Sequence, residues 1–503
     1  MKENLQFTAL LDILSRQDLI TEYSEDCKDI TPSHITINSK DVVPGTFFVC
    51  KGASFKEDYL KSAIAQGAIV YLSQQKYDDV DIPYIIVNDI RKAMALAARW
   101  FFGNPGDNMT KVGITGTKGK TTVTFVMKDI LDKYTDNRCS AFSTHEIDVG
   151  TKVFETTLTT PEPIELQTYF DMAVDEGCTH CIMEVSSQAM KMNRIYGEHY
   201  KVGVFTNIDY DHISPTEHAS MEDYLGCKVS FLKQCDNVVL YSDTRYFETI
   251  YNEVRDKHVV VYGSKESIEK LMSRDDDFFE KDTDFASIHN EDLTDHNSYF
   301  ELIYGGENRA YNTNLIGDYN VENIVAAIIS SLLIGIPNDQ IRSSIRDVYV
   351  PGRLQVYHWK DRTFMIDYAH NYISMYRLYE MVKKTMKPKS ITVVFGCGGE
   401  RYKKRREDMG RLAEQYADKV VLTMEDPGFE SCEEIKQYIT KPCYIIVDRE
   451  QALTRALDEA QPGELVITTG KGIESTQRIN GTFVQCHSDA QVIEHWLTEH
   501  PEK

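Results

Sequence analysis

A glycine-rich segment carries the strongest chemical signal in this sequence. Residues 112 to 122 read VGITGTKGKTT, and an amphipathic run follows up to residue 134. A strand, a glycine turn and a helix in this order direct backbone N–H groups and the positive end of the helix at a phosphate chain. Lys120 is expected to reach the β and γ phosphates of a nucleotide, and the Thr121 hydroxyl to help bind Mg²⁺. The expected loop residues are Gly116, Thr117, Lys118, Gly119, Lys120, Thr121 and Thr122.

The spacing of this segment departs from the usual GxxxxGK[ST] pattern, because Ile114 stands five residues before Gly119. A helix-capping glycine turn with an incidental lysine is the alternative. The agreement of strand, loop and helix around the segment favours the phosphate loop.

Two polar residues follow other apolar runs. Glu184 lies near the end of the run 181–185, and His212 follows the run 204–208. Strands of an open parallel sheet present their carboxyl ends at one edge, so both side chains are expected beside the phosphate loop, where they can contact a metal or a phosphate. Taken singly, a solvated carboxylate and an ordinary loop histidine explain them equally well.

The elements that position these residues alternate between strands and helices. Residues 1–108 mix a helical start with short β-rich runs, at 35–37, 46–49, 69–72 and 84–87. Parallel strands with crossover helices are indicated from 111 onward, and buried strands at 391–395, 420–423, 444–447 and 465–468 predict a second Rossmann-like sheet. We therefore predict an α/β protein with three domains, at 1–108, 109–348 and 349–503.

Composition limits the possible partners. The 503 residues carry 55 Lys and Arg against 78 Asp and Glu, a net charge of −23, which disfavours nucleic acid and anionic membranes as partners. No apolar run is long enough to span a membrane, and no signal peptide is recognised. Eleven cysteines without a framework spacing favour reduced thiols, so we expect a cytoplasmic protein. The pair Cys178 and Cys181 is interpreted as core thiols and not as half of a zinc site.

The motifs together resemble the Mur ligases of peptidoglycan synthesis, most closely the MurE type, over almost the whole chain. The matching segments, in the order of the family, are GTKGKTT (116–122), TTP (159–161), EVSS (184–187), DH (211–212), YLGCK (224–228), GDYNVENIVAA (317–327), PGR (351–353), DYAH (367–370) and VFGCGG (394–399). The resemblance implies a small UDP-binding domain, a central phosphate-loop ATPase domain and a C-terminal Rossmann-like domain that binds the incoming amino acid.

The resemblance also implies roles for individual residues. Lys120, Lys228 and His212 are the expected catalytic groups. Lys228 matches a lysine that the family carries as a carbamate, and the expected Mg²⁺ ligands are Thr121, Glu184, His212 and carbamylated Lys228. Further contacts to ATP are expected from Asn320, Asn323, Arg353 and Asp367.

The implied substrates are a UDP-N-acetylmuramoyl-dipeptide and a free diamino acid, joined by a monomeric enzyme that consumes ATP. The residues expected to bind them are Ser39, Lys40, Thr159, Thr160, Ser186, Arg194, Glu425, Asp426 and Glu474. Lys40, Gln188 and Gln355 depart from the residues usual in the family. A noncatalytic descendant therefore stays open, as does a ligase like folylpolyglutamate synthetase, although the latter lacks a UDP-binding first domain.

The identity of the amino acid rests on residues 425–428, which read Glu-Asp-Pro-Gly. Family members that add meso-diaminopimelate have Asp-Asn-Pro-Arg here, and the arginine binds the distal carboxylate of the substrate. Without that arginine a buried distal carboxylate has no partner, whereas Glu425 and Asp426 favour a side-chain ammonium. The resemblance thus implies L-lysine, with L-ornithine and meso-diaminopimelate as alternatives. A simpler reading is that the two acidic residues cap the following helix.

Overall fold

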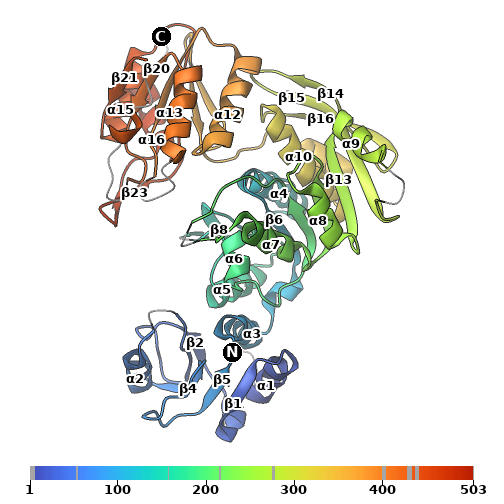
Figure 1. Ribbon diagram of the computed structural model, residues 1–503, viewed down its shortest axis with the longest axis vertical. Helices are drawn as coiled ribbons and strands as arrows, with labels where there is room; N and C mark the ends of the chain where they lie inside the picture. The colour runs from blue at the N-terminus through green and yellow to red at the C-terminus, as the bar shows by residue number, and fades with distance from the viewer. Residues whose placement is uncertain are drawn as a thin grey trace. The chain divides into compact units, whose positions relative to one another are not determined.

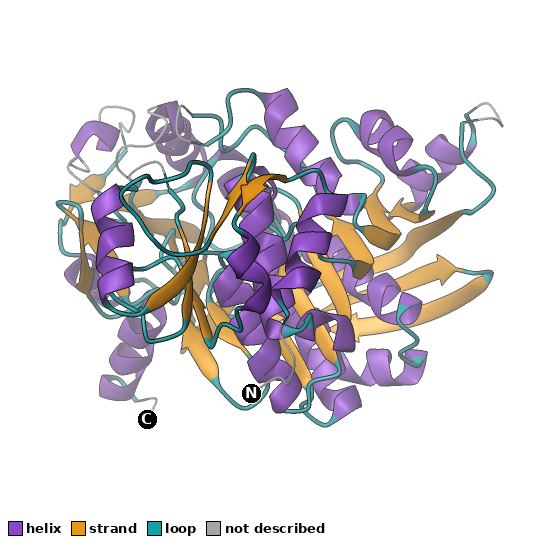
Figure 2. Ribbon diagram, turned by 90° about the horizontal axis from the view of Figure 1, so that it is seen from below, coloured by secondary structure: helices purple, strands orange, loops and turns teal. Residues whose placement is uncertain are grey.

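The structure is a computed structural model that describes residues 6–52, 55–156, 158–214, 217–274, 278–398, 404–427, 433–436 and 441–501. The chain forms two compact units, one of residues 1–262, 269–285 and 328–340 and the other of residues 263–268, 286–327 and 341–503. Figure 1 traces the chain from the N-terminus to the C-terminus, and Figure 2 shows helices lying beside the strands.

The first unit begins with a five-stranded sheet of order β1-β5-β4-β3-β2. Its elements are α1 (Phe7–Arg16), β1 (Ile20–Tyr23), β2 (His34–Thr36), β3 (Thr46–Val49), α2 (Glu57–Ala65), β4 (Ala68–Ser73), β5 (Tyr84–Val87) and α3 (Ile90–Phe102). The run Thr-Phe-Phe-Val of β3 is buried on both faces: Phe47 and Val49 pack with α1 and α3, and Phe48 packs with α2. This two-sided burial explains why the strand is uniformly apolar.

The larger sheet of the first unit carries the phosphate loop. Parallel strands run in the order β13-β12-β11-β6-β10-β7, and β8 and β9 extend this order by antiparallel pairing. The strands are β6 (Thr110–Thr115), β7 (Cys139–Phe142), β8 (Glu146–Asp148), β9 (Val153–Glu155), β10 (His180–Glu184), β11 (Tyr200–Phe205), β12 (Cys235–Tyr241) and β13 (His258–Ser264). The helices are α4 (Lys120–Thr135), α5 (Pro163–Asp175), α6 (Ser187–Lys191), α7 (Met221–Leu232), α8 (Phe247–Val254) and α9 (Lys265–Met272).

The second unit contains an antiparallel meander and a six-stranded sheet of order β17-β18-β22-β19-β20-β21. The meander consists of β14 (Thr283–Leu293), β15 (Ser298–Tyr304) and β16 (Glu307–Thr313), and the helices α10 (Asp318–Leu333) and α11 (Asn338–Ser344) follow it. The sheet strands are β17 (Gln355–Trp359), β18 (Arg362–Asp367), β19 (Ser390–Phe395), β20 (Lys419–Leu422), β21 (Cys443–Ile445) and β22 (Glu464–Thr469). The remaining elements are α12 (Tyr372–Met381), α13 (Lys404–Tyr416), α14 (Glu433–Lys436), α15 (Arg449–Glu459), β23 (Thr476–Ile479), β24 (Thr482–Gln485) and α16 (Asp489–Glu499).

Helices cover both faces of this six-stranded sheet. Val393 and Phe395 of β19 point to a core shared with α12 and α13, whereas Val394 points to a core shared with α15 and α16. Apart from the antiparallel edge strand β17, the sheet is parallel, and its burial on both faces is the doubly wound arrangement predicted for the C-terminal part. The α/β class and the three main sheets are confirmed, and the boundaries at 108 and 348 remain predictions.

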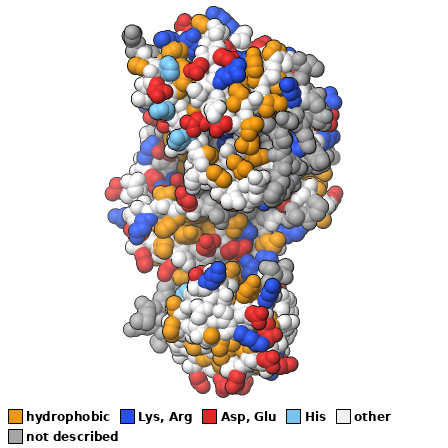
Figure 3. Space-filling view, turned by 90° about the vertical axis from the view of Figure 1, so that its left-hand side faces the viewer, with side chains coloured by type: hydrophobic (Ala, Val, Ile, Leu, Met, Phe, Trp, Pro, Cys, Tyr) orange, Lys and Arg blue, Asp and Glu red, His pale blue; other side chains and the backbone are white. Residues whose placement is uncertain are grey.

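The helices and the surface bear on the expectations that the protein neither spans a membrane nor binds nucleic acid. Among the described residues, no helix is both long enough and apolar enough to cross a bilayer. On the face drawn in Figure 3, acidic and basic side chains are interspersed, with hydrophobic side chains between them. Cys178 and Cys181 are buried, with Cys181 on β10, which agrees with their interpretation as core thiols.

A buried charge network joins α3 to the sheet of the first unit. Glu198 is 4% exposed and pairs with Arg99 of α3 and Lys111 of β6, and it also accepts a 2.9 Å hydrogen bond from Gln167 of α5. Burial alone raises the pKa of Glu198, but the ammonium of Lys111 and the guanidinium of Arg99 outweigh burial and lower it. The network therefore depends on an ionised carboxylate.

We expect Glu198→Gln to lower the free energy of unfolding by about 3 kcal/mol, because Arg99 and the buried Lys111 lose their buried anion and keep only the exposed carboxylate of Asp107. Because the folded-state pKa is lowered, the contribution of Glu198 is complete above the pKa of an unfolded glutamate and is lost as the pH falls through the folded-state value. Urea unfolding at neutral pH measures the difference. Glu253→Gln, which removes an exposed pair with Lys233, is the control, and an equal effect of both variants contradicts the prediction.

Candidate active site

The phosphate loop connects β6 to α4 as predicted. Gly116 has φ +146°, and a Cβ there would lie 2.0 Å from Thr206 Oγ1, so this position requires glycine. Gly119, with φ +87°, directly precedes the first residue of α4, Lys120. The backbone N–H of Lys118 donates to Asn207 Oδ1 at 2.9 Å. The end of β11 thus holds the loop in shape before any ligand binds.

Two lysines converge on this loop. Lys120 Nζ donates to the carbonyl oxygen of Gly116 at 3.0 Å, and Lys228 Nζ donates to the same oxygen at 2.8 Å. Lys228 lies on α7 and is 2% exposed, with Nζ 4.8 Å from the centre of the Tyr224 ring. Burial, and secondly the charge of Lys120, hold the pKa of Lys228 well below its usual range. A solvent-exposed lysine, the simpler sequence interpretation, is wrong here.

Glu184 ends β10, the strand that pairs with β6. Its carboxylate is fully buried and accepts hydrogen bonds from the Thr144 N–H at 3.2 Å and the Thr144 hydroxyl at 3.0 Å. Within the described part of the chain, no basic side chain pairs with it. A buried carboxylate with only neutral donors is a group that a bound cation stabilises. Sequence reasoning missed Thr144, which carries no motif signal.

The loop after β11 contacts the phosphate loop, and the His212 ring on it lies 5.7 Å from the ring of Tyr224, whose hydroxyl is 3.0 Å from Thr117 Oγ1. Lys118 Nζ lies 3.4 Å from Asp211 Oδ2. The His212 ring is exposed, and its Nδ1 lies 3.0 Å from Glu217 Oε1. His212 has φ +59°, a conformation that a loop residue adopts where the chain turns sharply.

A second group of predicted residues gathers around Thr160. The Thr160 hydroxyl donates to the carbonyl oxygen of Glu184 at 2.8 Å and accepts from the Ser186 N–H at 3.1 Å. Arg194 Nη1 donates to the Thr160 carbonyl oxygen at 3.0 Å. These residues adjoin the Glu184 carboxylate through Thr144, whose Oγ1 lies 3.2 Å from Thr159 Oγ1 and can accept from it.

Sequence reasoning missed a charged pair that adjoins this group. Glu162 Oε1 accepts from Arg194 Nε at 3.0 Å, and Glu162 Oε2 pairs with Lys51, which lies two residues after β3. Two cations face one carboxylate, which leaves a net positive charge. The only signal was that Glu162 directly follows Thr160-Pro161. Ser39 and Lys40 lie on the turn between β2 and β3, where the Ser39 carbonyl oxygen accepts from Gln66 at 2.8 Å.

In the second unit, the predicted nucleotide residues lie near the start of α10 and around β18. Asn320 Nδ2 donates to the Ile316 carbonyl oxygen at 2.9 Å, and Asn323 is one turn further along α10. Asp367 ends β18 and accepts from the Leu354 N–H at 3.0 Å. The Arg353 guanidinium stacks over the Tyr368 ring at 4.3 Å. Asp367 and Arg353 are therefore brought together.

Two of the three acidic residues predicted to bind the amino acid contact a lysine that the prediction did not include. Lys471 Nζ lies 3.0 Å from Asp426 Oδ1 and 2.6 Å from Glu474 Oε2, and Lys471 is 2% exposed. Glu425 is buried beside Gly470, where an added Cβ would meet its Oε2 at 2.6 Å. Two carboxylates, those of Asp426 and Glu474, therefore face the ammonium of Lys471. Gly428 lies outside the described residues, and the next described helix, α14, begins at Glu433.

Known protein families match most of this chain. A model of the Mur ligase middle domain matches residues 114–331, and a model of the Mur ligase glutamate ligase domain matches residues 352–472. A UDP-N-acetylmuramyl-tripeptide synthetase of Limosilactobacillus reuteri is 35% identical, with 98% of this chain and 99% of that protein covered. A UDP-N-acetylmuramoyl-L-alanyl-D-glutamate--L-lysine ligase of Streptococcus pneumoniae serotype 2 is 36% identical, with 98% of this chain and 100% of that protein covered.

Solved structures share the fold. A UDP-N-acetylmuramoyl-L-alanyl-D-glutamate--2,6-diaminopimelate ligase superimposes with a TM-score of 0.66 at 23% identity, covering 96% of this chain and 98% of that chain. A folylpolyglutamate synthase of Mycobacterium tuberculosis, solved with ADP, has a TM-score of 0.58 at 15% identity. It covers 75% of this chain and 91% of its own, whereas the first match spans nearly all of both chains.

Proposed function

The chain belongs to the Mur ligase family, and from this premise we propose that it adds L-lysine to UDP-N-acetylmuramoyl-L-alanyl-D-glutamate in an ATP-dependent reaction of peptidoglycan precursor synthesis. It is an ATP-dependent ligase that adds an amino acid to the dipeptide precursor. The observation that carries the choice of L-lysine is the full-length similarity, at 35–36% identity, to ligases of Enterococcus faecalis and Streptococcus pneumoniae that are named for this amino acid.

In the proposed reaction, the terminal carboxylate of the dipeptide attacks the γ-phosphorus of ATP, an O–P bond forms and ADP leaves. The amine of the incoming amino acid then attacks the acyl phosphate carbon, a C–N bond forms, and phosphate and a proton are released. Two anions must approach each other in the first step, so positive charge has to be concentrated at the γ-phosphate. Lys120 and the N-terminus of α4 supply it in this proposal.

The metal proposal rests on Glu184. Its buried carboxylate lacks a cationic partner among the described residues and ends the strand next to the phosphate loop, which suits a Mg²⁺ ligand. Thr121 is the proposed second ligand, and Lys228 as a carbamate and His212 are proposed for a second Mg²⁺. Bound Mg²⁺ would neutralise the phosphate oxygens. The Nδ1 of His212 lies 3.0 Å from Glu217 Oε1, so Nε2 is the nitrogen proposed to bind the ion.

Carbamylation of Lys228 is proposed on the position of this side chain. An ammonium buried beside Lys120 repels both that lysine and any nearby Mg²⁺, whereas reaction of the neutral amine with CO₂ converts the same side chain into an anionic oxygen donor. The C–N bond of the carbamate forms as the amine loses one proton to solvent.

The substrate side of the site is proposed to be anion-binding. Lys51 and Arg194 outnumber Glu162, so this cluster keeps a net positive charge for the carboxylates of the muramoyl dipeptide. Thr159, Thr160 and Ser186 adjoin it and offer hydroxyl groups. Ser39 and Lys40 are proposed to contact the uridine diphosphate. The residues proposed to contact ATP are Asn320, Asn323, Arg353 and Asp367.

The ten described cysteines are free thiols, which suits the cytoplasmic monomer that we propose.

We expect L-lysine to exceed meso-diaminopimelate by at least tenfold in kcat/KM, which corresponds to about 1.4 kcal/mol of transition-state discrimination. The physical reason is that Asp426 and Glu474 share the single ammonium of Lys471, which leaves a net negative charge that favours a side-chain ammonium over a carboxylate. Phosphate release with UDP-muramoyl dipeptide and a panel of amino acids, including L-ornithine, measures this preference.

The same assay separates the remaining alternatives. A tenfold preference for meso-diaminopimelate contradicts the choice of L-lysine but leaves the ligase assignment intact. Phosphate release that does not depend on both the dipeptide and an amino acid contradicts the proposed reaction itself. Binding of ATP without any turnover corresponds to the noncatalytic alternative.

A further inference from the structure

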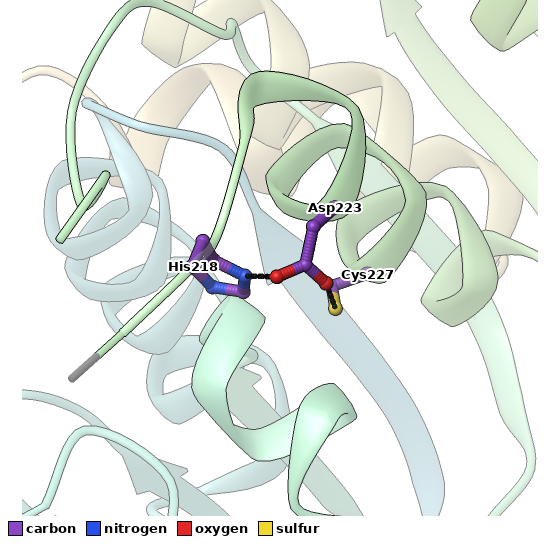
Figure 4. A group of neighbouring side chains, drawn as sticks. All are labelled: His218, Asp223 and Cys227. Atoms are coloured by element: carbon purple, nitrogen blue, oxygen red, sulfur yellow. Dashed lines mark hydrogen bonds and ion pairs between the residues drawn. The ribbon is translucent and has the colours of Figure 1, made fainter. Parts of the chain in front are cut away.

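Three side chains of different donor types meet between α7 and the loop that precedes it. We call His218, Asp223 and Cys227 the His–Asp–Cys cluster (Figure 4). Asp223 and Cys227 are one turn apart on α7 and point to the same side, toward the ring of His218 (Figure 4). One donor atom from each residue lies within 4.8 Å of the other two.

The distances between these donors approach those of a metal site. His218 Nδ1 lies 3.2 Å from Asp223 Oδ2, and Cys227 Sγ lies 3.7 Å from Asp223 Oδ1. Tetrahedral zinc with bonds of about 2.0–2.3 Å places its ligand atoms roughly 3.3–3.7 Å apart. These two distances end on different oxygens of Asp223; with one oxygen counted for the carboxylate, the three donor atoms lie within 4.8 Å of one another, so side-chain rotations are needed to bring them onto one ion.

The surroundings orient the donors. His218 is fully buried, and its Nε2 lies 2.9 Å from Ser187 Oγ, so the second ring nitrogen is engaged while Nδ1 faces Asp223. Metal-binding histidines typically have such a partner on the other ring nitrogen. Asp223 Oδ2 also accepts from the Ala219 N–H at 3.1 Å. The loop and the helix therefore hold the cluster together without a metal.

One cation competes for this position. Lys191 Nζ lies 2.7 Å from Asp223 Oδ2 and also donates to the Glu217 carbonyl oxygen at 2.8 Å. A divalent ion that binds the carboxylate more strongly can displace the ammonium, which keeps its bond to Glu217. The thiol of Cys227 releases its proton to solvent when it becomes a ligand.

We propose that the His–Asp–Cys cluster binds one Zn²⁺ ion, with solvent completing the coordination. Imidazole and thiolate donors select Zn²⁺ over Mg²⁺, which prefers oxygen ligands, so this site is distinct from the Mg²⁺ site proposed at Glu184. The ion ties the loop that contains His212 to α7, one residue before Lys228. The proposal does not depend on the ligase activity.

Cadmium titration of the full-length protein tests this proposal, because a thiolate bound to Cd²⁺ gives an ultraviolet charge-transfer band. We expect one equivalent of Cd²⁺ to produce the band in the reduced wild type, and Zn²⁺ to remove it by competition. Cys227→Ser is expected to lose this stoichiometric band, and Asp223→Asn to weaken binding at least about tenfold. Cys443→Ser, which changes a partly exposed cysteine elsewhere, serves as the control and keeps the band.

Thermal melting in EDTA verifies that each variant is folded, and native mass spectrometry of the wild type with Zn²⁺ gives a second readout of stoichiometry. A one-equivalent band that persists in Cys227→Ser overturns the proposal. So does a wild type that binds no Zn²⁺ ion in the mass spectrum, or an Asp223→Asn variant with unchanged Cd²⁺ affinity.

Discussion

Lys228→Met is expected to lower kcat by roughly a thousandfold or more, while the protein stays folded. Methionine fills most of the buried space that Lys228 occupies on α7, so packing is largely kept. The variant loses the nitrogen beside the Gly116 carbonyl oxygen, which is the atom proposed to take up CO₂. Loss of one preorganised charged group in a closed site commonly costs two to three powers of ten.

Phosphate release under saturating substrates measures this effect, with thermal melting as the test of folding. Lys233→Ala is the matched control, because Lys233 lies just after α7 but is exposed and pairs with Glu253. Mass analysis of the intact wild type is expected to show the added mass of CO₂ in bicarbonate buffer. A Lys228→Met variant with more than about one-tenth of wild-type kcat contradicts the proposed role.

Lys120→Ala is the second change with a large expected effect, a decrease in kcat/KM of roughly a hundredfold to a thousandfold. Lys120 begins α4 and its Nζ lies over the phosphate loop, 3.0 Å from the Gly116 carbonyl oxygen. The cation that would balance charge on the transferred phosphoryl group is removed, whereas the loop backbone keeps its hydrogen bonds to Asn207.

Steady-state kinetics with varied ATP measures this loss. Lys133→Ala is the control on the same helix, since Lys133 pairs with Asp129 on the exposed side of α4. An unchanged kcat/KM in a folded Lys120→Ala variant removes the phosphate-loop assignment. If Lys228→Met is inactive while Lys120→Ala keeps full activity, Lys228 acts independently of nucleotide binding.

Long apolar runs made the parallel strands predictable. The runs at 112–115, 391–395 and 465–468 all lie in the interiors of sheets, where both faces are covered and nearly every residue is apolar. The meander β14 to β16 and the short strands β8 and β9 were not predicted. Many residues of β14 and β16 are exposed, and β8 and β9 are only three residues long. The hydrophobic pattern that indicates a strand in the sequence is therefore weak in these segments.

The candidate site likewise contains residues that the sequence predicted and residues that it did not. Residues near one another in sequence, such as Gly116 to Lys120, form the phosphate loop through local turn and helix geometry, and sequence alone predicted them. Thr144 beside Glu184 and Lys51 beside Glu162 come from distant segments. No local pattern reports such pairs, because only packing of separate elements sets the distance between them.

The sequence by itself determined the α/β class, the phosphate loop and, through its motifs, the family of the chain. Strand periodicity and the glycine turn depend on neighbouring residues, so they are readable without a fold. Only the tertiary structure decided that Lys228 is buried against the Gly116 carbonyl oxygen, 112 residues away, and that Lys471 lies between Asp426 and Glu474. The charge and reactivity of such groups depend on burial and on partners from other elements, which exist only once the chain has folded.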